Sequence, residues 1–167
     1  MQPERQKRMI GYFIEEATTH LDTIEQGLVN LSSSIDKYSI VDDLLFAAHS
    51  LAGGAAMIGI DSISSICANL KSCFQPLQLE SSVKFDLKLK KMFMQAFYGI
   101  KELVYHLNQS SELSDAKAIK VMSEIEITLA QIRDYMDGMG KRSLQNDLPT
   151  FLTDETLSMF DDFFLSR

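Results

Sequence analysis

Apolar side chains recur along most of the chain at intervals of three and four residues, the spacing of helices that pack one face on a core. No stretch alternates polar and apolar residues for long enough to be a strand. The pattern predicts an all-α protein with five helices: about 4–32, a stretch around His49 that ends at Gly59, a stretch capped by Asp61 or Ser62, about 82–108, and about 114–137.

Residues that cap or break helices predict where these stretches begin and end. Ser39 followed by Asp42 resembles a capping box that opens the helix around His49, and Gly59 suits the C-terminal end of that helix. The third helix is expected to give way to a loop, and the fifth to stop, at residues that interrupt helices: Pro76 with residues 78–82, then Gly138 and Gly140.

Short connections between long amphipathic helices favour an antiparallel four-helix bundle with an additional C-terminal helix. That last helix either packs alongside the bundle or pairs with another molecule. Residues 1–138 are predicted to form the bundle, and residues 139–167 an acidic and aromatic tail or linker. The tail either leads to a further domain or is a docking segment, since aromatic side chains in such density favour burial.

The segment from residue 44 to 60, LLFAAHSLAGGAAMIGI, combines a histidine with two adjacent glycines, Gly53 and Gly54. A glycine inside a helix costs about 1 kcal/mol relative to alanine, so the pair indicates a need for small volume. At roughly 100° per residue, His49 lies roughly 140° from the centre of the apolar stripe. The imidazole is therefore expected to face away from the core. That stripe comprises Leu44, Ala48, Leu51, Ala55 and Ile58.

The face around His49 has no charged residue, and it comprises Leu45, Phe46, Ala52, Gly53 and Ala56. Helical side chains lean toward the N-terminus, so a long side chain at position 52 or 53 would cover the ring. Metal binding would want a second ligand three or four residues away, and none is present. General acid or base catalysis would want an orienting carboxylate, and the nearest are about two turns away.

Nucleophilic use of the imidazole remains. A solvated imidazole is largely neutral at pH 7 and has a nitrogen lone pair that can attack phosphorus. The product, a phosphoramidate, has most of two negative charges and needs open space without acidic neighbours. The uncharged face around His49 meets both needs.

The sequence AHSLAGGAAMIG resembles the signature of histidine phosphotransfer (HPt) domains, in which a His is followed by a basic residue at +3, a Gly at +4 and a Gly at +10. His49, Gly53 and Gly59 match this signature, whereas Ala52 replaces the basic residue. Over roughly residues 5–110 the chain is similar to the N-terminal HPt domain of chemotaxis-type (CheA-like) and hybrid histidine kinases, especially the cyanobacterial kind.

The chemotaxis-type relatives carry an HxxE arrangement on the third helix, whose Glu orients the active imidazole through its other nitrogen. The corresponding positions here are Ala68 and Lys71. A lysine cannot accept that hydrogen bond. Lys71 either supplies the positive charge missing at Ala52 or is an ordinary solvated lysine.

The resemblance implies a phosphorelay intermediate. His49 would take a phosphoryl group, on Nε2, from a histidine kinase or a receiver aspartate and pass it to a response-regulator receiver domain. Phe46 and Met57 flank the His49 face and, with Leu45 and Ala56, are expected to form the apolar surface on which the receiver docks. No ATP-binding GxxxxGK[ST] motif occurs, so the chain is expected to be a phosphocarrier without cofactor or metal, on its own or at the front of a larger kinase.

Two other functions stay open. The changes at Ala52, Ala68 and Lys71 would suit a degenerate HPt-like module that binds receivers or kinases without being phosphorylated. An enzyme with a metal site in the bundle core would need ExxH motifs, and no helix has one. The cognate partner, the direction of phosphoryl flow and the oligomeric state are not determined by the sequence.

Composition excludes some partners. The formal charge of -7, with no basic cluster, argues against nucleic acid and anionic membranes. Without a run of about 18 apolar residues or a signal peptide, the chain is expected to be cytoplasmic. Cys67 and Cys73 are interpreted as core thiols in a reducing compartment, and His20 and His106 as structural.

Overall fold

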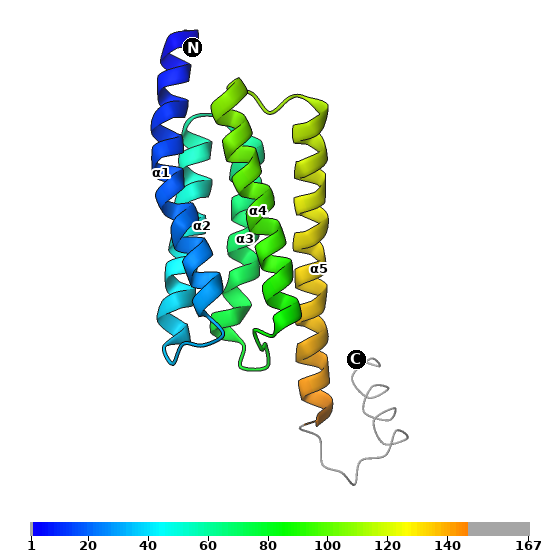
Figure 1. Ribbon diagram of the computed structural model, residues 1–167. Helices are drawn as coiled ribbons and strands as arrows, with labels where there is room; N and C mark the ends of the chain where they lie inside the picture. Colours follow the sequence, from blue (N-terminus) through cyan, green and yellow to red (C-terminus); the bar gives the residue numbers. More distant parts are fainter. Residues whose placement is uncertain (1, 147–167) are drawn as a thin grey trace, which may run out of the picture.

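The computed structural model describes residues 2–146, which form five helices and no strand, so the predicted all-α fold is confirmed. The successive helices run antiparallel (Figure 1). They are α1 (Pro3–Asn30), α2 (Lys37–Met57), α3 (Asp61–Leu79), α4 (Leu87–Ser110) and α5 (Ala116–Asn146).

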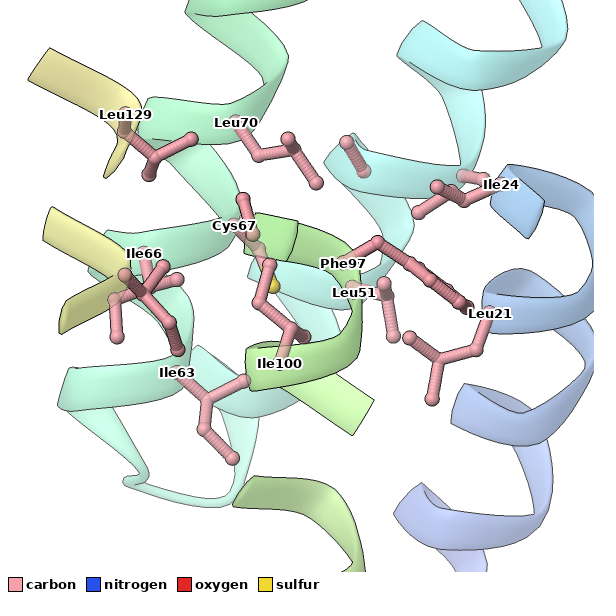
Figure 2. Packing of buried hydrophobic residues seen from close by; sticks show 14 of the residues in the cluster. Leu21, Ile24, Leu51, Ile63, Ile66, Cys67, Leu70, Phe97, Ile100 and Leu129 are labelled. Atoms are coloured by element: carbon pink, nitrogen blue, oxygen red, sulfur yellow. The ribbon is translucent and has the colours of Figure 1, made fainter. Parts of the chain in front are cut away.

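Each helix packs on its neighbours around one core. α1 contacts α2 and α4, α2 contacts α3, and α5 packs along both α3 and α4. The fifth helix therefore packs alongside the bundle in its own chain. Side chains from all five helices meet in the interior (Figure 2), and on the α3–α4 side Phe74 stacks on Phe93 with ring centroids 5.1 Å apart.

The helix that presents His49 begins earlier than predicted. The carboxylate of Asp36 accepts a hydrogen bond from the Ser39 N–H at 3.1 Å, so Asp36 caps α2 and the expected capping box at Ser39 and Asp42 is wrong. The first three residues of α2, Lys37, Tyr38 and Ser39, are exposed, so the spacing of buried apolar residues does not indicate where the helix begins.

The predicted end of α2 at Gly59 is confirmed. Gly59 has φ +78°, its N–H bonds to the Ala56 carbonyl at 3.1 Å, and the Ile60 N–H bonds to the Ala55 carbonyl at 2.9 Å. This is the Schellman arrangement, in which glycine is favoured because its φ is positive. α3 follows at once with Asp61 as its first residue, so neither Asp61 nor Ser62 is the cap; Ile60 holds that position without a side-chain bond.

Three other predicted ends are corrected. α3 continues through Pro76 to Leu79, since a proline in the last turn removes only one hydrogen bond of the helix. α4 begins at Leu87, where Asp86 accepts from the Leu89 N–H at 2.8 Å, and not at 82. The apolar residues before it belong to the loop; Phe85 packs against Phe93 there.

α5 runs through Gly138 and Gly140 to Asn146, so the two glycines do not end it. Met136 and Met139, on either side of Gly138, are both buried. Their burial stabilises the helix beyond its predicted end at Gly138. Tyr135 also donates a hydrogen bond to Asp86, the cap of α4. The helix thus passes the predicted domain boundary at 138, and the rest of the predicted tail, residues 147–167, lies outside the described residues.

Among the described residues one helix, α2, is long and apolar enough to cross a membrane by length and composition. Its apolar stripe packs between α1 and α3, whereas Asp42 and Asp43 lie exposed on it. Core helices of folded bundles pass the same test, so the finding does not by itself indicate a membrane span.

Asp115 connects the start of α5 to the end of α4. Its Oδ1 accepts from the Ala118 N–H at 2.8 Å, and its Oδ2 lies 2.7 Å from His106 Nε2. The Ala118 hydrogen bond, together with the charge of His106, lowers the pKa of Asp115 below its ordinary value. The structural role expected for His106 agrees with this contact.

Because the fold lowers this pKa, the Asp115 carboxylate adds stability above the unfolded-chain pKa of about 3.9 and loses it as the pH falls through the folded value. Asp115→Ala should therefore lower the melting temperature at pH 7, with the difference from wild type narrowing at pH 3. Asp115→Asn keeps a side-chain oxygen that can cap the helix but removes the negative charge. This variant therefore shows how much of the stability comes from the cap and how much from the charge. An equal difference at both pH values would contradict this account.

Candidate functional site

His49 lies on the exposed face of α2, as the helical angles predict. Leu44, Ala48 and Leu51 on the opposite face are buried in the core, whereas the imidazole is exposed. It occupies the central part of the helix, away from both ends of the bundle. A molecule that approaches α2 from solvent can therefore reach the ring.

Lys71 reaches the ring from the neighbouring helix α3. Its Nζ lies 3.3 Å from His49 Nδ1, and its side chain is half-buried. An ammonium group has three donors and no acceptor, so Lys71 donates and Nδ1 accepts. Of the two roles left open for Lys71, this contact fits a cation held beside the histidine better than a freely solvated side chain.

The surroundings of the pair are small and uncharged. Ala52 is half-buried, whereas Gly53 and Ala68 are exposed. Within the described range no carboxylate lies in ion-pair distance of either His49 or Lys71. Among the described residues, Lys71 supplies the side-chain polar contact that the ring makes.

The two glycines after His49 have different surroundings. A Cβ placed on Gly53 would meet nothing within 4 Å, whereas one placed on Gly54 would lie 3.2 Å from Cδ2 of Phe13. Gly54 therefore permits the close approach of α1 to α2. Gly53 meets no packing requirement of the bundle, and its small size leaves the space beside the imidazole open to solvent.

Apolar side chains flank the imidazole, as the sequence predicts. Phe46 is 67% exposed and Met57 is 83% exposed, Ala56 is exposed, and Leu45 is half-buried. Single exposed apolar residues occur on most protein surfaces, so a docking role for these two depends on their position on the same helix as His49. Whether a receiver docks there stays a prediction.

α1 supplies a part of this surface that was not predicted from the sequence. His20, interpreted only as structural, packs edge-on against Phe46 with ring centroids 6.1 Å apart. A shallow groove of about 180 Å³ runs beside Met57 between α1 and α2, and Tyr12, 70% exposed, lines it with Met9. Tyr12, which is exposed on α1, and His20, which borders the apolar stripe of that helix, were the available signal.

The two cysteines take no part in the site. Both are buried, and burial raises the pKa of Cys67 to about 12 and that of Cys73 to about 11. Both thiols are thus protonated at neutral pH, in agreement with their interpretation as core residues. Residues 2–146 contain no group of three His, Cys, Asp or Glu side chains placed to hold a metal ion.

The model of the Hpt domain matches residues 8–135, from α1 through most of α5. The chain belongs to the Hpt domain family. Hpt domains are phosphocarriers rather than enzymes, and this membership supports a phosphotransfer role in two-component signalling.

Chemotaxis protein CheA of Borreliella burgdorferi is similar to the chain, with 23% identity over 114 residues. The aligned part is 64% of this chain and 13% of that protein, so the Hpt chain spans a small fraction of its relative's length. No solved structure matches the chain significantly.

The different surroundings of the two glycines can be tested by measuring stability. Gly53→Ala should stabilise the Hpt domain by up to about 1 kcal/mol, because alanine is the better helix former and no atom obstructs its Cβ. Gly54→Ala should gain less or lose stability, because Phe13 must move. Chemical denaturation of both variants measures the difference, and equal gains would show that Gly54 has no packing role.

Proposed function

We propose that His49 is the phosphorylated residue of this Hpt domain. It takes a phosphoryl group on Nε2 from the catalytic domain of a histidine kinase or from the phosphoaspartate of a receiver domain, and it passes the group to a receiver domain. The strongest support is the exposed imidazole beside the empty space at Gly53, at the histidine position of the family signature.

The transfer is a displacement at phosphorus. The Nε2 lone pair forms the N–P bond, while the P–O bond to the aspartate, or to ADP when ATP is the donor, breaks and its electron pair leaves on that oxygen. In the onward step a receiver carboxylate attacks the phosphorus, and the N–P bond breaks. Nothing in the chain needs to bind ATP, which agrees with the absence of a GxxxxGK[ST] motif.

The apolar groups around His49 form the receiver-docking surface in this proposal. Leu45, Phe46, Ala56 and Met57 of α2 lie on the same side as the imidazole, and His20 of α1 supports the Phe46 ring. A docked receiver would bury these groups and bring its aspartate to the open space over Gly53. Burial of an exposed aromatic anchor is a common main contribution to binding.

A wider context follows from the similarity to CheA. In the relative the aligned part is 13% of a longer protein, so the Hpt domain acts either as a free protein or at the front of a larger kinase, in the cytoplasm in both cases. The two protonated core thiols suit a reducing compartment.

A second candidate function is a module that binds receivers or kinases without being phosphorylated. The contact between Lys71 and His49 favours it, because the ammonium occupies the ring nitrogen to which relatives present an acceptor. The two candidates differ in one observable: whether a phosphoryl group is ever attached to His49.

The deciding experiment incubates the protein with a labelled phosphorylated receiver, or with a histidine kinase and labelled ATP, beside a His49→Gln control. A label that is acid-labile, base-stable and lost in the control supports the phosphocarrier. Tight binding of the receiver without label in either protein would instead establish the binding module.

Phe46→Asp should slow phosphoryl transfer to the receiver about tenfold or more, since a buried charge replaces an aromatic anchor. The melting temperature should change little because Phe46 is 67% exposed. Ile127→Asp is a matched control: Ile127 is 56% exposed on α5, a helix without contact to α2. Equal transfer rates in the two variants would place the docking surface elsewhere.

A further inference from the structure

The contact between Lys71 and His49 determines where the imidazole proton lies. Lys71 Nζ is 3.3 Å from Nδ1 and can only donate a hydrogen bond. The contact is a hydrogen bond only when Nδ1 is unprotonated. A neutral imidazole has one N–H, so in this arrangement the proton is on Nε2.

This tautomer cannot carry out the proposed transfer. Attack on phosphorus by Nε2 needs the lone pair of that nitrogen, which the proton occupies. An acceptor opposite Nδ1 would favour the reactive tautomer, with the proton on Nδ1 and the lone pair on Nε2. Lys71 has the opposite effect, because a cation in this position favours the unreactive tautomer.

We propose that Lys71 is a positioning residue that keeps His49 in the unreactive Nε2–H tautomer until a partner with an acidic surface docks and draws the ammonium away. This inference rests on the proposed function of His49. It adds a condition: the histidine becomes a nucleophile in the complex and stays unreactive toward phosphoryl donors in the free domain.

The unpaired charge of Lys71 and the length of its side chain both support release by an acidic partner. No carboxylate in the described part of the chain lies within ion-pair distance of Lys71, so the ammonium has no counter-ion that would compete with one from a partner. The lysine side chain is long and flexible, and its head is a point charge without a fixed geometry. The neighbouring surface of α2 is uncharged, so Lys71 marks the place where a carboxylate would bind.

The steps balance without a further reactant. When Lys71 leaves, Nε2 gives its proton to water and Nδ1 takes one from water. Nε2 then forms the N–P bond as the P–O bond of the donor breaks, and the Nδ1 proton passes to water. Nδ1 is again an acceptor at the end, so the ammonium of Lys71 can return to it or pair with the phosphoryl oxygens.

The first measurement separates a tautomer effect from a merely structural one. The ¹⁵N NMR shifts of the His49 ring, recorded at a pH where the ring is neutral, should report the Nε2–H form in wild type. Lys71→Glu should shift the ring toward the Nδ1–H form because the carboxylate accepts. Lys91→Met, on the exposed side of α4, is the control and should leave the shifts unchanged.

The second measurement uses phosphoramidate, a small donor that needs no docking surface. Labelling of His49 should rise about tenfold or more in Lys71→Met and Lys71→Glu relative to wild type, in proportion to the reactive fraction of the ring. With a phosphorylated receiver as donor, wild type should be labelled readily. Melting temperatures of all variants confirm that they fold.

Failure of the inference is distinguishable from failure of the proposed function. Equal labelling of wild type and Lys71→Met by phosphoramidate, or an Nδ1–H ring in wild type, overturns the role of Lys71 while His49 remains a phosphocarrier. If a receiver or kinase labels only the Lys71 variants, the release by a partner is overturned. Absence of label in every protein overturns the proposed function itself.

Discussion

The burial of one face of α2 is the constraint on which the rest of the structure depends. Leu44, Ala48, Leu51 and Ala55 must lie in the core, and α1 and α3 pack on either side of the helix to cover them. The opposite face then has no neighbour in the bundle and must meet solvent or a partner. The exposure of His49, the support of Phe46 by α1 and the approach of Lys71 from α3 all follow from this packing.

Features that follow from helical periodicity could be predicted from the sequence. The five helices, the buried stripe of α2 and the outward direction of His49 need only the angle between successive residues and a core to bury them. The end of α2 at Gly59 could also be predicted, because a glycine with positive φ is favoured just after the last turn of a helix. These are local properties of the chain.

Features that depend on contacts between distant segments could not be predicted. A helix cap such as Asp36 is defined by one hydrogen bond from its side chain, and several nearby polar residues could form an equivalent bond. α5 continues past Gly138 because Met136 and Met139 are buried against other helices. The positions of His20 and Tyr12 beside the α2 surface require the rotation of α1 relative to α2, which no pattern within α1 determines. For Lys71 the sequence left two roles open, and only a distance could favour one of them.

The short turn between α2 and α3 has a consequence for how this site can change. Gly59 and Ile60 bond back to α2, and α3 begins at the next residue, so the turn fixes the rotation of α3 about its own axis. One inserted residue would turn α3 by roughly 100° and take Lys71 off the imidazole although both side chains were intact. The chemical state of the histidine is thus tied to the length of a connection some ten residues away. The same rotation would turn the buried side chains Ile63, Ile66 and Leu70 out of the core, so the length of this turn maintains both the packing of α3 and the position of Lys71.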